Sequence, residues 1–286
     1  MLVMNRATRN LVNRILIGLA LAAGPGMGAG IAATSIHASF AAPQTISDPR
    51  AIAIIEEMAA HYSKLQSVQV DTNGDLPLIT IMGKANIRFH VTLALQRPDR
   101  YAYYVDSTTR TGDRTTNKVM LAILGNGRSA ISYNGSLKQY TRSRPVSLAA
   151  IAAQRPARPD MLWGGATKLL LAFFIHSPED RAAKKFFPGA RLVGRKLLNG
   201  TPVAVIEYFP LPGKLASLGK YFIAVDTRSD VLVRCSDVIA PQNPFSAVET
   251  EDVRPVSVNE LLPDSVFNFR PPPGARLVAK FSAPSG

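Results

Sequence analysis

The feature that most restricts the fold of this chain is a strand-like alternation of apolar and polar side chains. Residues 87–95, IRFHVTLAL, carry an apolar side chain at every second position, among them Phe89, Val91 and Leu93. Because successive side chains of a strand point to opposite faces, this run predicts a strand with one fully apolar face. Such a face needs neighbouring strands beside it and a cover over it.

Turn signals between further strand-like runs predict that the strands are joined by hairpins. Asn134-Gly135 and Asn199-Gly200 each separate two such runs, Arg228-Ser229 lies between two more, and Gly125-Asn126-Gly127 precedes the run RSAISY. Asn-Gly favours tight hairpins because both residues tolerate a positive φ. The pattern predicts a mainly β protein built on a curved antiparallel sheet or barrel.

One amphipathic helix is expected before the strands. Asp48 is placed to cap it and Pro49 to occupy its first turn. Apolar side chains, including Ile52, Ile55 and Tyr62, then recur at helical spacing. We expect a helix of about five turns that packs its apolar stripe on another element.

The segment 145–187 interrupts the strand pattern. Its stretch 169–175, LLLAFFI, is apolar on every side, and such a helix is either covered all round or faces something other than water. Two interpretations remain open. The segment is a core helix of the same domain, or it is a lid whose inner side meets an apolar ligand.

Residues 1–41 have the three-part layout of a secretory signal. Arginines precede a long uncharged run, and Ser39-Phe40-Ala41 supplies the small residues that signal peptidase reads. We expect cleavage between Ala41 and Ala42. An uncleaved membrane anchor is the alternative, but Gly24-Pro25-Gly26 breaks the apolar run.

The mature chain, residues 42–286, is expected to be a single periplasmic domain. Its only cysteine is Cys235, which excludes an internal disulfide, and no cysteine follows the signal to carry a lipid anchor. The full sequence has a formal net charge of +13, and about +10 remains on the mature chain without Arg6, Arg9 and Arg14. This charge favours anionic partners such as lipid headgroups, or merely solvates the surface. Export argues against nucleic acid as a partner.

No motif typical of enzymatic or metal chemistry occurs in the sequence. There is no GxSxG elbow, no HExxH and no P-loop. His61, His90 and His176 lack the spacing of metal ligands, and the acidic run 249–252 is typical of an exposed loop. We therefore expect a non-enzymatic protein with no cofactor and no metal.

Three stretches, taken in order, resemble the LolA-like superfamily, the periplasmic carriers of outer-membrane lipoproteins and their relatives. They are LALQRPDRYAYYV at 93–105, LGNGRSAISYNGSLKQYT at 124–141 and NELLPDSVFNFRPPPGARLV at 259–278. The first is similar to a family strand in which aromatics follow an Arg-Pro pair, and the last to the closing F.F.PP.G signature. The match spans nearly all of residues 48–280 and points to a branch of predicted periplasmic proteins.

This resemblance implies an incomplete antiparallel half-barrel around the N-terminal helix, with the insert 145–187 as a helical lid over a concave apolar surface. Phe267 and Phe269 would share one face of the strand that closes the half-barrel, and the prolines at 271–273 would end it. Arg97 would hold the lid closed through hydrogen bonds to lid backbone. The residues expected to form this latch and the cavity are Arg97, Tyr101, Phe89, Val91, Leu93, Trp163, Leu170, Phe173, Phe174, Phe267 and Phe269.

Together these features lead to the hypothesis of a soluble, monomeric periplasmic protein that binds a lipid or the acyl chains of a lipoprotein, as carrier or sensor. Burial of acyl chains would supply the affinity, and Arg97 or Arg100 would meet an anionic headgroup. A protein of the inner or outer membrane would be a further partner. The alternative is a regulatory module on the same fold that binds a partner protein. A hydrolase-type enzyme is a remote third reading.

Overall fold

The computed structural model describes residues 47–80, 83–112, 114–153, 165–175, 187, 189–208, 219–239 and 248–281. The expected signal and its cleavage site lie outside these residues. Residues Gln44–Gly286 form one compact unit.

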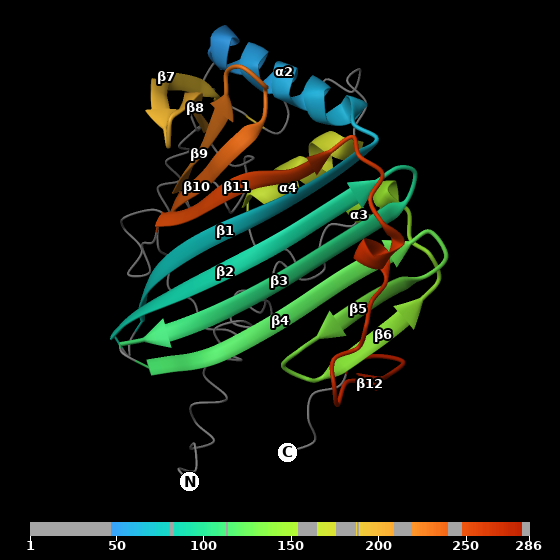
Figure 1. Ribbon diagram of the computed structural model, residues 1–286. Coiled ribbons are helices and arrows are strands. Elements are labelled where there is room, and N and C mark those ends of the chain that lie inside the picture. The colour runs from blue at the N-terminus through green and yellow to red at the C-terminus, as the bar shows by residue number, and fades with distance from the viewer. Residues whose placement is uncertain are drawn as a thin grey trace, which may run out of the picture. The chain divides into compact units, whose positions relative to one another are not determined.

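A single sheet of 12 strands dominates this unit, in the order β12-β6-β5-β4-β3-β2-β1-β11-β10-β9-β8-β7 (Figure 1). The strands are β1 Ser67–Thr80, β2 Gly83–Gln96, β3 Arg100–Thr111, β4 Arg114–Asn126, β5 Ala130–Asn134, β6 Gln139–Ser143, β7 Arg191–Leu198, β8 Thr201–Tyr208, β9 Gly219–Asp226, β10 Leu232–Ile239, β11 Val248–Val258 and β12 Arg276–Leu277. Neighbours pair antiparallel except β12, which runs parallel to β6. Within the described ranges the end strands β12 and β7 do not pair with each other, so the sheet is open. The incomplete half-barrel is confirmed, and the closed barrel is not formed.

The predicted hairpins are confirmed. Asn199-Gly200 joins β7 to β8, and both residues have a positive φ, 49° and 82°. Asn134-Gly135 follows β5 before β6, and Arg228-Ser229 lies between β9 and β10. In these last two turns the residues with a positive φ are Lys138 and Asp230, at 50° and 55°.

In the part of the chain that the structure describes, three α-helices accompany the sheet: α2 Pro49–Lys64, α3 Leu148–Ala153 and α4 Gly165–Ile175. Helix α2 confirms the predicted amphipathic helix. The Asp48 carboxylate accepts a hydrogen bond from the Arg50 N–H at 2.9 Å and caps the helix, with Pro49 in the first turn. Its buried side chains include Ile55 and Met58.

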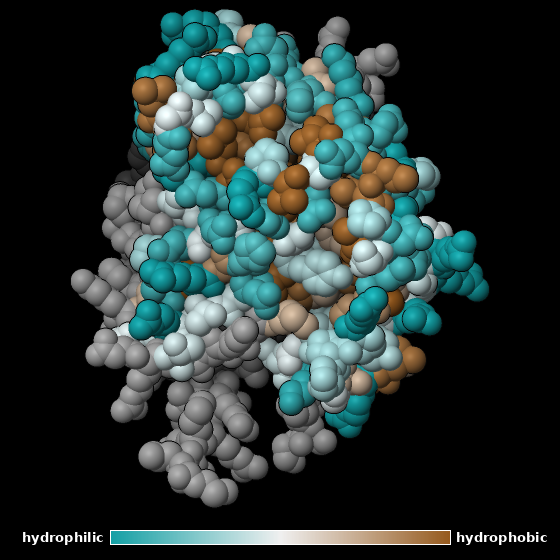
Figure 2. Space-filling model, in the orientation of Figure 1, coloured by the Kyte–Doolittle hydropathy of each residue, from teal (hydrophilic) through white to brown (hydrophobic). Residues whose placement is uncertain are grey.

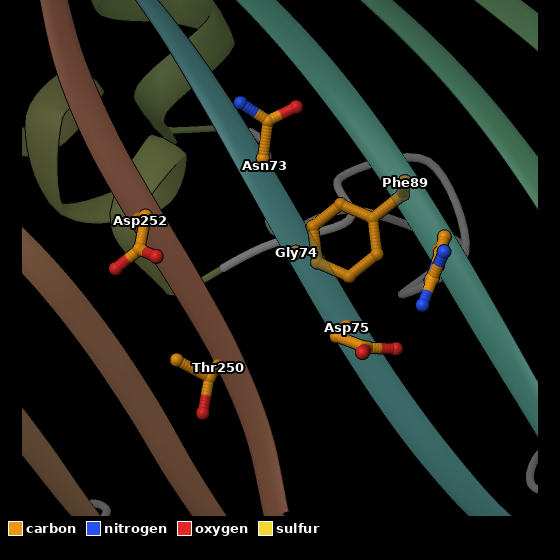
Figure 3. Close-up of a pocket in the computed structure, with 7 residues that line it drawn as sticks. Asn73, Gly74, Asp75, Phe89, Thr250 and Asp252 are labelled. Atoms are coloured by element: carbon orange, nitrogen blue, oxygen red, sulfur yellow. The ribbon is translucent and has the colours of Figure 1, made fainter.

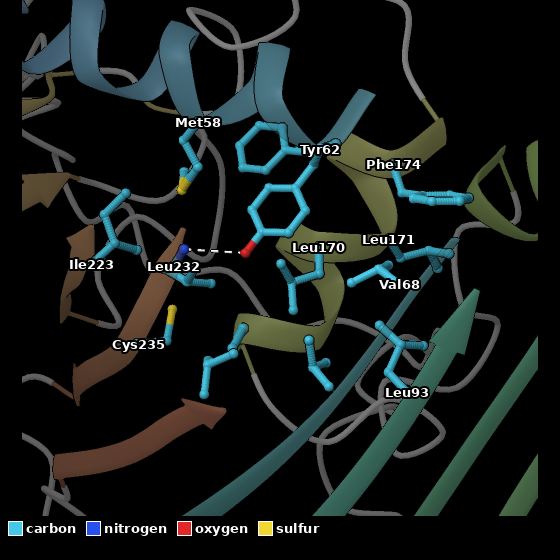
Figure 4. Close-up of a cluster of buried hydrophobic side chains, with 14 of the residues drawn as sticks. Met58, Tyr62, Val68, Leu93, Leu170, Leu171, Phe174, Ile223, Leu232 and Cys235 are labelled. Atoms are coloured by element: carbon cyan, nitrogen blue, oxygen red, sulfur yellow. Dashed lines mark hydrogen bonds between the residues drawn. The ribbon is translucent and has the colours of Figure 1, made fainter. Parts of the chain in front are cut away.

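One face of the sheet packs against α4, and we call it the inner face. Helix α4 contacts β2, β10 and β11, and α2 contacts both α4 and the end strand β7. Side chains from both helices meet those of the strands in one buried cluster, shown in Figure 4. Within it the Tyr62 hydroxyl accepts a hydrogen bond from the Leu232 N–H at 3.1 Å. The strand alternation and the two apolar helix surfaces therefore build a single core.

The opposite, outer face carries a second, smaller cluster that the C-terminal segment covers. The sheet contributes Ala94, Ala102, Ala122, Leu124 and Tyr133, and the segment contributes Leu262 and Phe267. Elsewhere the side of the molecule seen in Figure 2 is mostly hydrophilic, with apolar side chains interspersed among polar ones over β7 to β11. Of the two buried clusters, the one on the inner face is the larger.

The prediction of a last strand at 266–270 is wrong. Residues Asp264–Phe267 form a short 3₁₀ helix, η4, in which the Val266 N–H donates to the Pro263 carbonyl at 3.0 Å. Figure 1 shows η4 and α4 on opposite sides of the sheet. Prolines at 263 and at 271–273 cannot donate to a ladder, so the short stretch between them does not pair as a strand.

Candidate functional site

The turn that joins β2 to β3 contacts the ends of two helices through one side chain. The Arg97 guanidinium donates from Nε to the Leu65 carbonyl at 2.9 Å, and from Nη2 to the carbonyls of Ser63 at 2.8 Å and Phe174 at 2.5 Å. These carbonyls lie at the C-terminal ends of α2 and α4, where helices leave carbonyl groups unpaired and carry partial negative charge. The Arg97 guanidinium carbon also lies 4.6 Å from the centre of the Phe174 ring.

Asp99, in the same turn, contacts the third helix. Its carboxylate accepts a hydrogen bond from the Leu148 N–H at the start of α3, at 3.0 Å. The three-residue stretch Arg97-Pro98-Asp99 therefore fixes the C-terminal ends of α2 and α4 and the N-terminal end of α3 at one point beside the sheet.

The other end of α4 is held by a carboxylate from the inner face. Glu251 of β11 is 1% exposed. Its carboxylate accepts hydrogen bonds from the Ala166 N–H at 2.9 Å and from the Thr167 hydroxyl at 3.3 Å. Helix α4 is thus held at its N-terminus by the buried carboxyl group of Glu251 and at its C-terminus by the Arg97 guanidinium.

Most of the predicted cavity residues come together beneath α4. Those in the inner cluster are Phe89, Val91, Leu93 and Tyr101 from the sheet, and Leu170, Phe173 and Phe174 from α4. Leu170 and Phe174 are fully buried. In this state the side chains of α4 themselves occupy the apolar surface, as Figure 4 shows for several of them.

Tyr101 lies flat on the inner face because its partner on the next strand is a glycine. Tyr101 pairs with Gly125 of β4, and a Cβ at Gly125 would lie 2.2 Å from the Tyr101 ring. Burial, with a smaller contribution from the Asp99 carboxylate, raises the pKa of Tyr101 to about 12. The ring is therefore neutral at physiological pH.

Three residues expected near the ligand belong to the other face. Phe267 is 2% exposed but lies in the outer cluster, and Phe269 packs there against Tyr133 and Tyr140, with ring centres 5.3 and 5.6 Å apart. Arg100 is paired with Asp264 at 2.6 Å and lies over the Phe267 ring. These three side chains hold the C-terminal segment on the sheet. Residues 266–270 do not form the predicted closing strand, and Phe267 and Phe269 therefore do not lie at the inner site.

Trp163, the remaining predicted residue, lies outside the described residues. Gly165 is the first residue of α4.

A cavity of about 340 Å³ opens where β1, β2 and β11 lie side by side (Figure 3). Its lining is Asn73, Gly74, Asp75, Arg88, Phe89, Thr250 and Asp252. Asn73, Asp75, Arg88 and Asp252 are exposed and alternate along their strands with buried inner-face residues, so they lie on the outer face. Gly74 and Phe89 complete the lining, and Phe89 also belongs to the inner cluster, so this depression borders that cluster.

Sequence reasoning missed two of the residues that anchor the helices. Asp99 follows the Arg-Pro pair directly, and its position before the insert gave no sign of its contact with α3. Glu251 lies in an acidic run that is typical of an exposed loop, yet strand alternation turns Glu251 inward and its neighbour Asp252 outward. Only the pairing register of β11 reveals the difference.

Among the described residues, no three His, Cys, Asp or Glu side chains are grouped to hold a metal ion. The helices that the structure describes include none long and apolar enough to cross a bilayer.

No protein-family model matches the sequence, and no curated protein matches it with significance. Solved structures do match. LprF from Mycobacterium bovis aligns over 76% of this chain and 96% of its own, with 12% identity and a TM-score of 0.40. The lipoprotein LppX from Mycobacterium tuberculosis aligns over 76% and 99%, with 15% identity and a TM-score of 0.39.

A LolA superfamily protein from Nitrosomonas europaea aligns over 77% of this chain and 97% of its own, with 14% identity and a TM-score of 0.29. These three structures each align with about three quarters of this chain. At such identities they say nothing of what this chain binds.

Proposed function

We propose that this chain is a periplasmic, non-enzymatic protein that binds a lipid or the acyl chains of a lipoprotein on the inner face of its sheet, with α4 as a movable lid. The observation that carries this proposal is the way α4 is held. Its apolar side chains cover the inner face, while its two ends are fixed by polar contacts from Glu251 and Arg97.

The apolar side chains beneath α4 form a surface that suits an acyl chain. Val91, Leu93 and Val105 are each at most 3% exposed and lie on neighbouring strands of the inner face. If α4 moves away, these side chains need a new apolar cover, and an acyl chain provides one at about 25 cal/mol for each Å² that it buries. The ligand would exchange places with side chains such as Leu170 and Phe174.

The contacts at the ends of α4 favour a lid over a permanent core helix. Three of the hydrogen bonds that hold its two ends involve the charged side chains of Arg97 and Glu251. Hydrogen bonds to charged groups are worth about 1.5–3 kcal/mol each, and water can replace them when the groups are exposed. The helix can thus detach at a moderate cost that an apolar ligand can offset.

Arg97→Leu is expected to bind lipid more tightly than the wild type. Loss of its hydrogen bonds weakens the closed state, and a ligand that binds the open state gains affinity by the same factor, about tenfold for each 1.4 kcal/mol. Native mass spectrometry of the protein incubated with dioleoyl phosphatidylglycerol measures the bound fraction. Arg100→Leu is the matched control, because Arg100 also lies over a Phe ring but on the outer face.

The proposal predicts lipid-bound wild-type protein, more bound lipid for Arg97→Leu, and wild-type binding for Arg100→Leu. Protein that stays lipid-free at every lipid concentration contradicts a lipid carrier and favours a module that binds a partner protein. Equal binding by all three proteins contradicts the role of α4 as the lid.

A further inference from the structure

Glu251 is a carboxylate in surroundings that are otherwise unsuited to charge. On the inner face it lies between Gly74 of β1 and Cys235 of β10, which are its partners on the neighbouring strands. The Phe89 ring lies against Gly74 on the same face. An ionised carboxylate is costly to bury unless it receives hydrogen bonds.

Helix α4 supplies those hydrogen bonds. The first N–H groups of a helix have no partner within the helix, and the Glu251 carboxylate accepts one of them, from Ala166, together with the Thr167 hydroxyl. If α4 leaves the sheet, the carboxylate loses both donors and gains water instead. The position of α4 and the environment of Glu251 are therefore coupled.

We propose that Glu251 is a second latch of α4 and that its ionisation opens this end of the lid, while Arg97 holds the opposite end. The inference rests on the proposed function, because it assumes that α4 moves. Glu251 acts here as a positioning residue: it sets the fraction of molecules in which the inner face is open to a ligand.

The groups that face the Glu251 carboxylate decide whether a rise in pH opens or closes this end of α4. Burial raises the pKa of Glu251, and this outweighs the opposing effects of the Thr72 hydroxyl of β1, the Ala166 N–H and Thr167 hydroxyl of α4, and the charge of Lys168. The other elements packed around it present the Thr72 hydroxyl of β1, the Phe89 ring of β2 and the Cys235 thiol of β10.

In the open state the carboxyl is hydrated and its pKa returns toward the usual value. The closed state therefore binds the proton more tightly than the open state. Closure is favoured at low pH and weakens as the pH rises through the raised pKa of Glu251. Each unit by which closure raises this pKa changes the opening equilibrium by a factor of about ten.

The single cysteine provides a direct readout. Cys235 is 2% exposed in the inner cluster, and its strand contacts α4. The rate at which 4,4′-dithiodipyridine labels the folded chain, divided by the rate for the same chain in denaturant at the same pH, gives the fraction of open molecules. This ratio is measured from pH 4.5 to 8, beside the global unfolding equilibrium.

For the wild type we expect the ratio to rise with pH and to exceed the globally unfolded fraction. Glu251→Gln keeps an acceptor for Ala166 but cannot ionise, so its ratio should not change with pH. Asp252→Asn, the neighbouring carboxylate on the outer face, should follow the wild type. Arg97→Leu should raise the ratio at every pH while keeping the pH dependence, because it releases the other latch.

If the labelling ratio of Glu251→Gln changes with pH as much as that of the wild type, the proposal that Glu251 is a second latch is wrong. If labelling also exceeds global unfolding in that case, α4 still moves and the proposed function stands. If the labelling ratio never exceeds the globally unfolded fraction, α4 does not move separately, and the proposals of a second latch and of a lid are both wrong. The lipid-binding measurement above then decides separately whether the chain binds lipid.

Discussion

Replacing Phe267 by Ala is expected to lower the free energy of unfolding by about 3–5 kcal/mol, the usual cost of deleting a buried Phe side chain. Phe267 is 2% exposed and fills the outer cluster, with the Arg100 guanidinium 4.2 Å from its ring centre. Without this ring the C-terminal segment loses its main contact with β3 and β4. Urea unfolding followed by circular dichroism measures the change.

The matched control for this prediction is Phe269→Ala. Phe269 is only half-buried in the same cluster, so its loss should cost clearly less than the loss of Phe267. Both variants should keep wild-type lipid binding, because both side chains lie on the outer face. If Phe267→Ala remains folded but binds less lipid, the ligand lies on the outer face, which contradicts the proposed site on the inner face.

Replacing Phe174 by Ala is expected to raise the fraction of molecules with an open lid more than a hundredfold. Phe174 is a fully buried side chain of α4, and the Arg97 guanidinium carbon lies 4.6 Å from its ring centre. Loss of its contacts costs about 3–5 kcal/mol of docking free energy, and 3 kcal/mol already exceeds a factor of one hundred. The labelling ratio of Cys235 measures this opening, and Leu169→Ala, at a half-buried position of the same helix, should change it far less.

The global stability of Phe174→Ala distinguishes a lid from a core helix. If α4 detaches before the sheet unfolds, the loss of global stability cannot exceed the docking free energy of α4, and the labelling ratio rises well above the unfolded fraction. A core helix would instead lose global stability by the full amount, and Cys235 labelling would follow unfolding alone.

Long, regular patterns were predictable from the sequence. The alternation in 87–95 became β2, with Phe89, Val91 and Leu93 on the inner face, and helix α2 begins at the proline that follows its cap. These predictions succeed because a strand with one apolar face and an amphipathic helix each leave few ways to bury their side chains. The Arg97 contacts have the form that the family resemblance implied, and their role as a latch stays a prediction.

Short patterns were not predictable. The five residues at 266–270 alternate like a strand, but two Phe side chains separated by one residue also suit a segment that crosses over a sheet. Flanking prolines and the apolar hollow formed by Ala94, Ala102 and Ala122 decided the outcome. Glu251 was missed for a related reason, because one position of register decides whether a residue in an acidic run points to water or to the core.

The most direct test of the central claim is to locate a bound acyl chain. The wild-type protein is incubated with phosphatidylglycerol that carries a diazirine at the end of one acyl chain, irradiated and analysed by peptide mass spectrometry. The account predicts adducts on α4 and on inner-face residues of β2 and β3, such as Leu93 and Tyr103, and few on the outer cluster around Phe267. Adducts confined to the outer face, or spread evenly over the surface, would contradict it.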